Sequence, residues 1–135
     1  MVKLLIIEDD PLILKMYQDI FKFEDYVVLV ASDGEEGIGM AKTEQPTLIL
    51  CDIMMPKMNG LQLLEKLKND EETQKIPVVM LTNLAGEQDA KTALMKGAVK
   101  YIVKSNYTPK QISDMVKEIA VGYTRNQIPG LSNSS

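Results

Sequence analysis

Two apolar runs in this sequence end in carboxylates. Asp52 directly follows Leu-Ile-Leu-Cys, and Glu8 and Asp9 directly follow Leu-Leu-Ile-Ile. Both runs are continuous rather than alternating, which is typical of β-strands that are covered on both faces. If the two strands are neighbours in a parallel sheet, their carboxyl ends meet at one edge and bring these carboxylates together. Like charges at close range repel each other, so such a site either raises a pKa or holds a cation.

The cation that such a site would hold is a hard one. The sequence has no histidine, and its single cysteine, Cys51, is expected to pack in the core, so oxygen atoms are the available ligands. Oxygen-only ligation favours Mg²⁺, Mn²⁺ or Ca²⁺, and Mg²⁺ is the usual partner of a few carboxylates and water. The absence of histidine also excludes Ser-His, Cys-His and His-metal sites.

Each acid also has a purely structural interpretation. Asp10 precedes Pro11, which favours a helix N-cap followed by proline at the first helical position. Glu8 and Asp9 could simply stabilise the same helix through its dipole. Asp52 is harder to explain in this way, because a methionine-rich segment rather than a helix follows it. A carboxylate at that position therefore needs another partner.

A hydroxyl and an ammonium group follow two further apolar runs. Thr82 ends Val-Val-Met-Leu-Thr, and Lys104 follows Tyr-Ile-Val. Together with a metal and a carboxylate, these groups would suit phosphate or a covalently held phosphoryl group. Taken singly, Thr82 could cap the next helix and Lys104 could be solvated. Their joint occurrence at strand ends favours the site.

The spacing of apolar residues predicts an alternation of strands and helices. Strands are expected at residues 3–7, 26–30, 47–51, 78–81 and 101–103. Helical stripes between them are formed by Leu12, Met16, Ile20 and Phe23, by Leu61, Leu64 and Leu67, and by Ile112, Met115, Val116 and Ile119. Two less apolar helices, at 34–45 and 86–98, offer as core contacts Ile38, Ala41, Ala90, Ala93 and Leu94, with a stop at Gly97. This order predicts an α/β fold with an open, doubly wound parallel sheet.

Composition limits the class of protein further. The 135 residues fit one domain over residues 1–122, followed by a polar tail at 123–135. A net charge of −4 and a single arginine, Arg125, argue against direct nucleic-acid binding. No apolar run approaches membrane-spanning length, no signal peptide is recognisable, and one cysteine suits a reducing compartment. These features indicate a cytoplasmic protein without a membrane partner.

Four motifs together resemble the receiver domain of two-component response regulators, of the chemotaxis-receiver type. They are LLIIEDD, LILCDIMMPKMNG, VVMLT and KGAVKYIVK, and the resemblance covers about residues 2–122. It implies a flavodoxin-like (βα)5 fold with five parallel strands in the order 2-1-3-4-5.

The resemblance also implies a reaction. Asp52 looks like the phosphoacceptor, which takes a phosphoryl group from the phosphohistidine of a sensor histidine kinase or of a histidine phosphotransfer protein. Mg²⁺, or Mn²⁺ in its place, would be bound by Asp9, by Asp52 and by the backbone carbonyl of Met54, with Glu8 acting largely through water. Such a protein is not an enzyme beyond self-catalysed phosphotransfer and slow autodephosphorylation.

Other matched positions imply how the signal is transmitted. Thr82 would hydrogen-bond the phosphoryl oxygens, Lys104 would pair with them, and the Tyr101 rotamer would report the phosphorylated state. Pro56 and Gly60 would shape the turn after the phosphoacceptor. The fourth and fifth strand–helix units would carry the signal to an unidentified protein target or to a second copy of the chain. We expect a stand-alone regulator, because no further domain follows in this sequence.

Two features depart from the family pattern. Ser105 follows Lys104, where family members usually have proline after a cis peptide bond, and a cis bond before another residue costs about 2.5–4 kcal/mol. Either this bond is trans and the loop differs, or the site stores strain. In the family, the residues two positions after the phosphoacceptor and after the threonine shade the acyl phosphate. Here these are Met54 and Leu84, both apolar, so slow hydrolysis is expected.

Three alternatives stay open. An aspartate-nucleophile phosphatase of the haloacid dehalogenase type uses similar groups, but it expects a second aspartate where this chain has Met54. A receiver-like interaction module would keep the fold without phosphorylation, and Ser105 is compatible with that. A nucleotide-binding α/β domain would need a glycine-rich turn after the first strand, and Glu-Asp-Asp-Pro-Leu-Ile has none.

Overall fold

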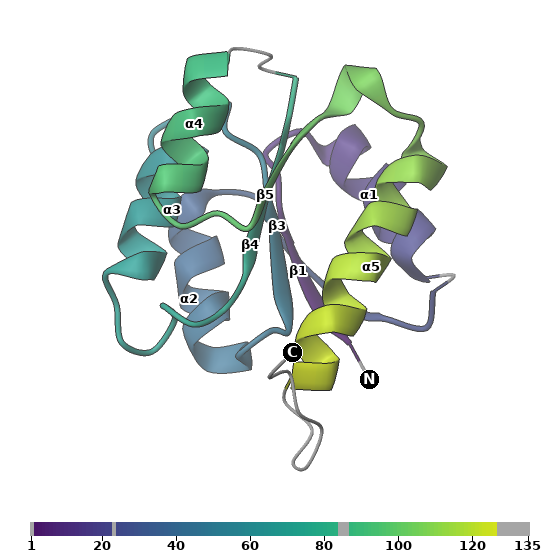
Figure 1. Ribbon diagram of the computed structural model, residues 1–135, viewed down its shortest axis with the longest axis horizontal. Coiled ribbons are helices and arrows are strands. Elements are labelled where there is room, and N and C mark those ends of the chain that lie inside the picture. The colour runs from purple at the N-terminus through teal and green to yellow at the C-terminus, as the bar shows by residue number, and fades with distance from the viewer. Residues whose placement is uncertain (1, 23, 84–86, 127–135) are drawn as a thin grey trace.

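The sheet has the predicted topology. A computed structural model describes residues 2–22, 24–83 and 87–126 (Figure 1). Its strands are β1 (Lys3–Ile7), β2 (Val27–Ala31), β3 (Leu48–Cys51), β4 (Val78–Thr82) and β5 (Lys100–Val103). All neighbouring pairs are parallel, and the order across the sheet is β2-β1-β3-β4-β5. The α/β fold class and the strand order expected from the sequence are therefore confirmed.

Helices cover both faces of the sheet. They are α1 (Pro11–Lys22), α2 (Gly34–Glu44), α3 (Gly60–Lys68), α4 (Glu87–Met95) and α5 (Pro109–Asn126), with a 3₁₀ turn, η1, at Lys104–Asn106. Figure 1 shows α1 and α5 on one face and α2, α3 and α4 on the other. None of the described helices has the length and hydropathy that crossing a bilayer requires.

The central strands are buried on both faces, because their side chains alternate between two cores. In β1, Leu5 and Ile7 pack toward α2 and α3, whereas Leu4 and Ile6 pack toward α1 and α5. These four side chains are at most 2% exposed. Full burial of one such side chain stabilises the fold by about 1.5–3 kcal/mol. Continuous apolar runs are thus what this architecture requires.

Two of the expected helix faces need correction. On α1, Leu12 and Met16 are 81% and 39% exposed, whereas Tyr17 and Phe21 are buried. Hydrophobic residues occupy more than one side of α1, so a four-residue spacing of hydrophobic residues can be found on two different faces of the helix. The face that is buried is the one with the larger aromatic side chains. On α4, Leu94 is also largely exposed, while Ala93 is buried as expected. Phe23, which was expected to extend the α1 stripe, lies outside the described residues.

Helix ends agree with elementary capping rules. The N–H of Leu12 donates to Oδ1 of Asp10 at 2.9 Å, and Pro11 is the first residue of α1, as expected of this N-cap. Gly97 follows the end of α4 and has a φ of 109°, a positive backbone angle that glycine adopts more easily than other residues. At the other end of the chain, α5 continues to Asn126, into the segment 123–135 that was expected to be tail. Residues 127–135 of that segment lie outside the described residues.

Candidate functional site

Backbone hydrogen bonds set Glu8 and Asp52 side by side at the carboxyl edge of the sheet. Ile7 and Cys51 are register partners at the ends of β1 and β3. The N–H of Asp52 donates to the carbonyl of Ile7 at 3.1 Å, and the N–H of Glu8 donates to the carbonyl of Ala31 at 3.1 Å. Both acids therefore start from fixed backbone positions.

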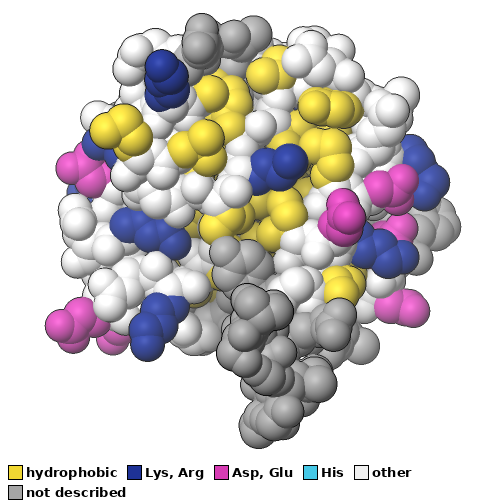
Figure 2. Space-filling model, in the orientation of Figure 1, with side chains coloured by type: hydrophobic (Ala, Val, Ile, Leu, Met, Phe, Trp, Pro, Cys, Tyr) yellow, Lys and Arg dark blue, Asp and Glu magenta, His cyan; other side chains and the backbone are white. Residues whose placement is uncertain are grey.

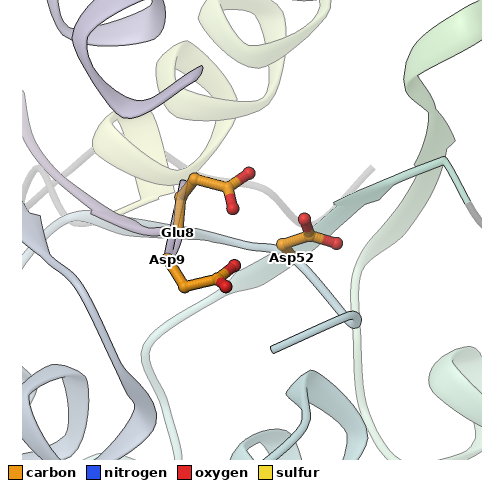
Figure 3. Close-up of side chains that lie close together, drawn as sticks. All are labelled: Glu8, Asp9 and Asp52. Atoms are coloured by element: carbon orange, nitrogen blue, oxygen red, sulfur yellow. The ribbon is translucent and has the colours of Figure 1, made fainter. Parts of the chain in front are cut away.

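Three carboxylates converge at this edge (Figure 3). Glu8, Asp9 and Asp52 each contribute one oxygen atom to a group whose members lie within 4.8 Å of one another. Asp9 is exposed, whereas Glu8 and Asp52 are only 4% and 9% exposed. Carboxylate oxygens at this spacing, open to water on one side, fit the ligand set of a hard divalent cation such as Mg²⁺.

Lys104, the first residue after β5, joins the same group. Its ammonium group donates to Oε1 of Glu8 at 2.8 Å and to Oδ2 of Asp52 at 3.2 Å. The three side chains are only 5–11% exposed. A buried lysine between two carboxylates compensates part of their charge, and with Asp9 the cluster still carries an excess of negative charge. Sequence reasoning placed Lys104 at this edge but did not predict its bond to Glu8.

Burial and charge act in opposite directions on these groups. Burial raises the pKa of Glu8, and the hydrogen bond and charge of Lys104 oppose that rise. For Lys104, burial alone would lower the pKa, but the hydrogen bond to Glu8 and the charge of Asp52 outweigh it, so its pKa lies above the usual value. Lys104 is therefore a cation at neutral pH.

The loop after β3 fixes the second oxygen of Asp52. The N–H of Met54 donates to Oδ1 of Asp52 at 3.1 Å, while Oδ2 faces Lys104. A Cβ atom on Gly60 would lie 2.3 Å from the backbone oxygen of Asp52, so a larger residue would displace the backbone at this point. The N–H of Gly60 donates to the carbonyl of Ile53 at 2.8 Å, which closes the loop. The carboxylate is thus oriented by its own turn.

Thr82 and Tyr101 lie near the same edge. Thr82 ends β4, is fully buried and is the register partner of Val103, the residue before Lys104. Tyr101 is half-buried and packs against the core shared with α2 and α3. Burial, followed by the charges of Asp89 and Asp52, raises the pKa of its phenol. Their roles in phosphoryl binding and switching stay predictions.

Three other expectations concern residues at or near this site, namely Ser105, Cys51 and Leu84. The peptide bond between Lys104 and Ser105 is trans, and the loop there is formed by η1. Of the two possibilities for Ser105 in place of the usual proline, the trans bond is therefore the one observed. Cys51 is buried, its Sγ donates to the backbone oxygen of Asp52 at 3.2 Å, and burial raises the pKa of its thiol. A packing role for this cysteine is consistent with that environment. Leu84, the second shading residue, lies outside the described residues.

Comparisons with known proteins agree with this geometry. The family model of the response regulator receiver domain matches residues 4–117. The chain is 33% identical over 108 residues to the polar-differentiation response regulator DivK of Brucella ovis, covering 80% of this chain and 88% of that protein. It is 36% identical over 119 residues to the DNA-binding dual master transcriptional regulator RpaA of Synechocystis, covering 88% of this chain but 48% of that protein.

A solved structure extends the likeness to three dimensions. The CheY-like response regulator receiver domain protein of Methanospirillum hungatei superimposes with a TM-score of 0.85 at 30% identity, covering 93% of this chain and 98% of that one. The chain spans about half the length of the first curated relatives that it matches.

Proposed function

Since this chain belongs to the response regulator receiver family, we propose that Asp52 accepts a phosphoryl group from a phosphohistidine in a Mg²⁺-dependent reaction. The donor would be a sensor histidine kinase or a histidine phosphotransfer protein. The observation that carries this proposal is the environment of Asp52, whose Oδ1 accepts from the N–H of Met54 and whose Oδ2 accepts from Lys104. A carboxylate held at both oxygens beside two further acids is preorganised for attack along one direction.

The transfer itself needs few groups. A carboxylate oxygen of Asp52 forms a bond to phosphorus while the bond between phosphorus and the imidazole nitrogen of the donor breaks, and the imidazole leaves with the bonding electron pair. Mg²⁺, when bound, would offset the repulsion between the acids and the incoming phosphoryl group. Its ligands would be Asp9, Asp52 and the carbonyl of Met54, with Glu8 acting largely through water.

Lys104 and Thr82 would respond to the new charge. Nζ of Lys104 already lies 3.2 Å from Oδ2 of Asp52, so a small movement would transfer that hydrogen bond to a phosphoryl oxygen while the bond to Glu8 is kept. The Thr82 hydroxyl would donate to another phosphoryl oxygen. Thr82 is the last residue of β4, which precedes α4 in the chain, and Lys104 is the first residue of η1, so their movement would be passed to those elements.

The proposed output surface comprises β4, α4, β5 and α5. Figure 2 shows hydrophobic side chains gathered in the middle of the face that carries α4 and α5. Large exposed hydrophobic residues in this region are Leu94, Met95, Val99 and Val121. An apolar surface next to a movable helix fits a protein partner or a second copy of the chain.

Intact mass measurement tests the proposal. The chain is incubated with acetyl phosphate, with and without Mg²⁺, as wild type and as Asp52→Asn. We expect one Mg²⁺-dependent phosphoryl adduct on the wild type and none on the variant. A folded wild type without an adduct would instead favour a phosphorylation-independent interaction module. Sustained turnover of a phosphate monoester would favour the phosphatase.

Other parts of the expected function stay predictions. Relatives are named as transcriptional or response regulators, which supports a regulatory rather than an enzymatic role. These predictions are stand-alone action, no direct nucleic-acid contact, cytoplasmic location and slow autodephosphorylation. Among these relatives, the chain covers 48% of each of the two that are named as transcriptional regulators.

A further inference from the structure

Met54 is a large hydrophobic residue of the acceptor loop whose side chain is exposed to water. The sequence has nine methionines, and three of the described ones have exposed side chains: Met16, Met54 and Met95. Met54 is 60% exposed, although Asp52, two residues before it, is 9% exposed. The other two exposed methionines lie on helices, Met16 on α1 and Met95 on α4.

The loop fixes the direction of this side chain. Ile53 and Met55, on either side of Met54, are only 4% and 8% exposed. Both neighbours are anchored in the core, so Met54 between them faces solvent. Its backbone N–H is bonded to Oδ1 of Asp52, which ties the residue to the acceptor carboxylate. The thioether of Met54, on a flexible side chain, therefore lies on the solvent side of this edge.

We propose that Met54 is a site of reversible oxidation by hydroperoxides, and that its sulfoxide shortens the lifetime of the phosphoryl group on Asp52. The second part rests on the proposed function. In the oxidation, the sulfur lone pair attacks the terminal oxygen of the hydroperoxide, the O–O bond breaks, and the leaving oxygen takes the electron pair and then the proton of the transferred oxygen. Sulfur is oxidised to the sulfoxide, and the peroxide is reduced to an alcohol or to water.

The effect on lifetime follows from polarity. A thioether is a weak hydrogen-bond acceptor and holds little water beside the acceptor carboxylate. A sulfoxide oxygen is a strong acceptor, so it recruits water to the side from which an acyl phosphate would be hydrolysed. Because the side chain is already mostly exposed, little of its surface is buried in the core, and making it more polar should leave the fold intact.

Met95 provides the matched control. It is 86% exposed, more than Met54, and should oxidise at least as readily. It is the last residue of α4, on a different element from the acceptor loop. Oxidation of Met95 should therefore leave the lifetime unchanged.

The experiment uses the full chain treated with hydrogen peroxide, with oxidation located by peptide mass mapping. Reduced and oxidised samples of wild type, Met54→Leu and Met95→Leu are phosphorylated with acetyl phosphate and Mg²⁺. After the donor is removed, loss of the adduct is followed by intact mass. We expect oxidation to shorten the half-life at least threefold in wild type and Met95→Leu, with recovery after methionine sulfoxide reductase, and to leave Met54→Leu unaffected. Met54→Gln should shorten the half-life without oxidant.

Three results would overturn the inference: no oxidation of Met54 while Met95 is oxidised, an unchanged half-life after complete oxidation of Met54, or equal shortening in Met54→Leu. An adduct missing from the reduced wild type would be a different failure. It would remove the proposed function and, with it, the lifetime effect, while the peptide map would still report whether Met54 is oxidised.

Discussion

The carboxyl edge around Asp52 and the helix α4 lie at the two ends of the proposed signal path, and they are held very differently. At the edge, buried ion pairs join Glu8, Asp52 and Lys104, and the following loop closes against Gly60. Among the described side chains of α4, only Ala93 is fully buried, whereas Leu94 and Met95 are exposed. A firmly built site beside a weakly anchored helix favours moving the helix rather than the site.

Removing the ammonium group of Lys104 should have the largest effect on stability. In Lys104→Met, two buried carboxylates lose their common cation, and breaking a buried pair costs about 3–5 kcal/mol. Urea unfolding at neutral pH measures the loss. The control is Lys15→Met, whose exposed partner Asp19 makes an i,i+4 pair of the kind that contributes about 0.3–0.5 kcal/mol. Equal losses in both variants would contradict a firmly held edge.

Alanine substitutions on α5 and α4, the two helices that flank β5, test how firmly α4 is anchored. Ile112 on α5 is 1% exposed, so Ile112→Ala should cost about 2–4 kcal/mol through lost burial and a cavity. Leu94 on α4 is 49% exposed, and Leu94→Ala should cost less than about 0.5 kcal/mol. Thermal and urea unfolding compare the two. A large cost for Leu94→Ala would show that α4 is better anchored than its burial indicates.

A single added methyl group probes the acceptor loop. Gly60→Ala would press against the backbone of Asp52 and should cost about 1–3 kcal/mol, with slower phosphotransfer because the acceptor is displaced. Gly39, on α2, has no atom within 4 Å of an added Cβ. Gly39→Ala should therefore stabilise the chain by about 0.5–1 kcal/mol through helix propensity. Tolerance of both changes would remove the argument for a tight loop.

The smallest expected effect is a change in the pH dependence of stability. The pKa of Glu8 is raised above its usual 4.5, so the native state binds more protons than the unfolded chain just above that pH. The corresponding stability is complete below pH 4.5 and is lost as pH rises through the native pKa. Glutamine does not titrate, so Glu8→Gln does not lose this stability as pH rises. The free energy of unfolding of the variant should therefore increase relative to that of the wild type between pH 4.5 and the native pKa of Glu8. Parallel pH profiles would argue against the raised pKa.

Much of this site could be predicted from the sequence, because strand ends are local features. Continuous apolar runs followed by Glu8, Asp52 and Lys104 were enough to place these groups at one edge. The bond between Lys104 and Glu8 could not be predicted, since it joins residues 96 positions apart through a side-chain geometry that no motif encodes. The buried face of α1 was missed for a different reason: Leu12 and Tyr17 both have large hydrophobic side chains, and only packing against the sheet distinguishes them.

Backbone amide exchange with and without acetyl phosphate and Mg²⁺ tests most directly whether a phosphoryl group on Asp52 changes α4, β5 and η1 while the strands β1 and β3 and the helix α5 keep their structure. Amides of α4 should exchange faster than those of α5 in the unmodified chain. Phosphorylation should alter exchange in α4, β5 and η1 in the wild type but not in Asp52→Asn. Unaltered exchange in α4 of a fully phosphorylated chain would contradict the proposed signal path.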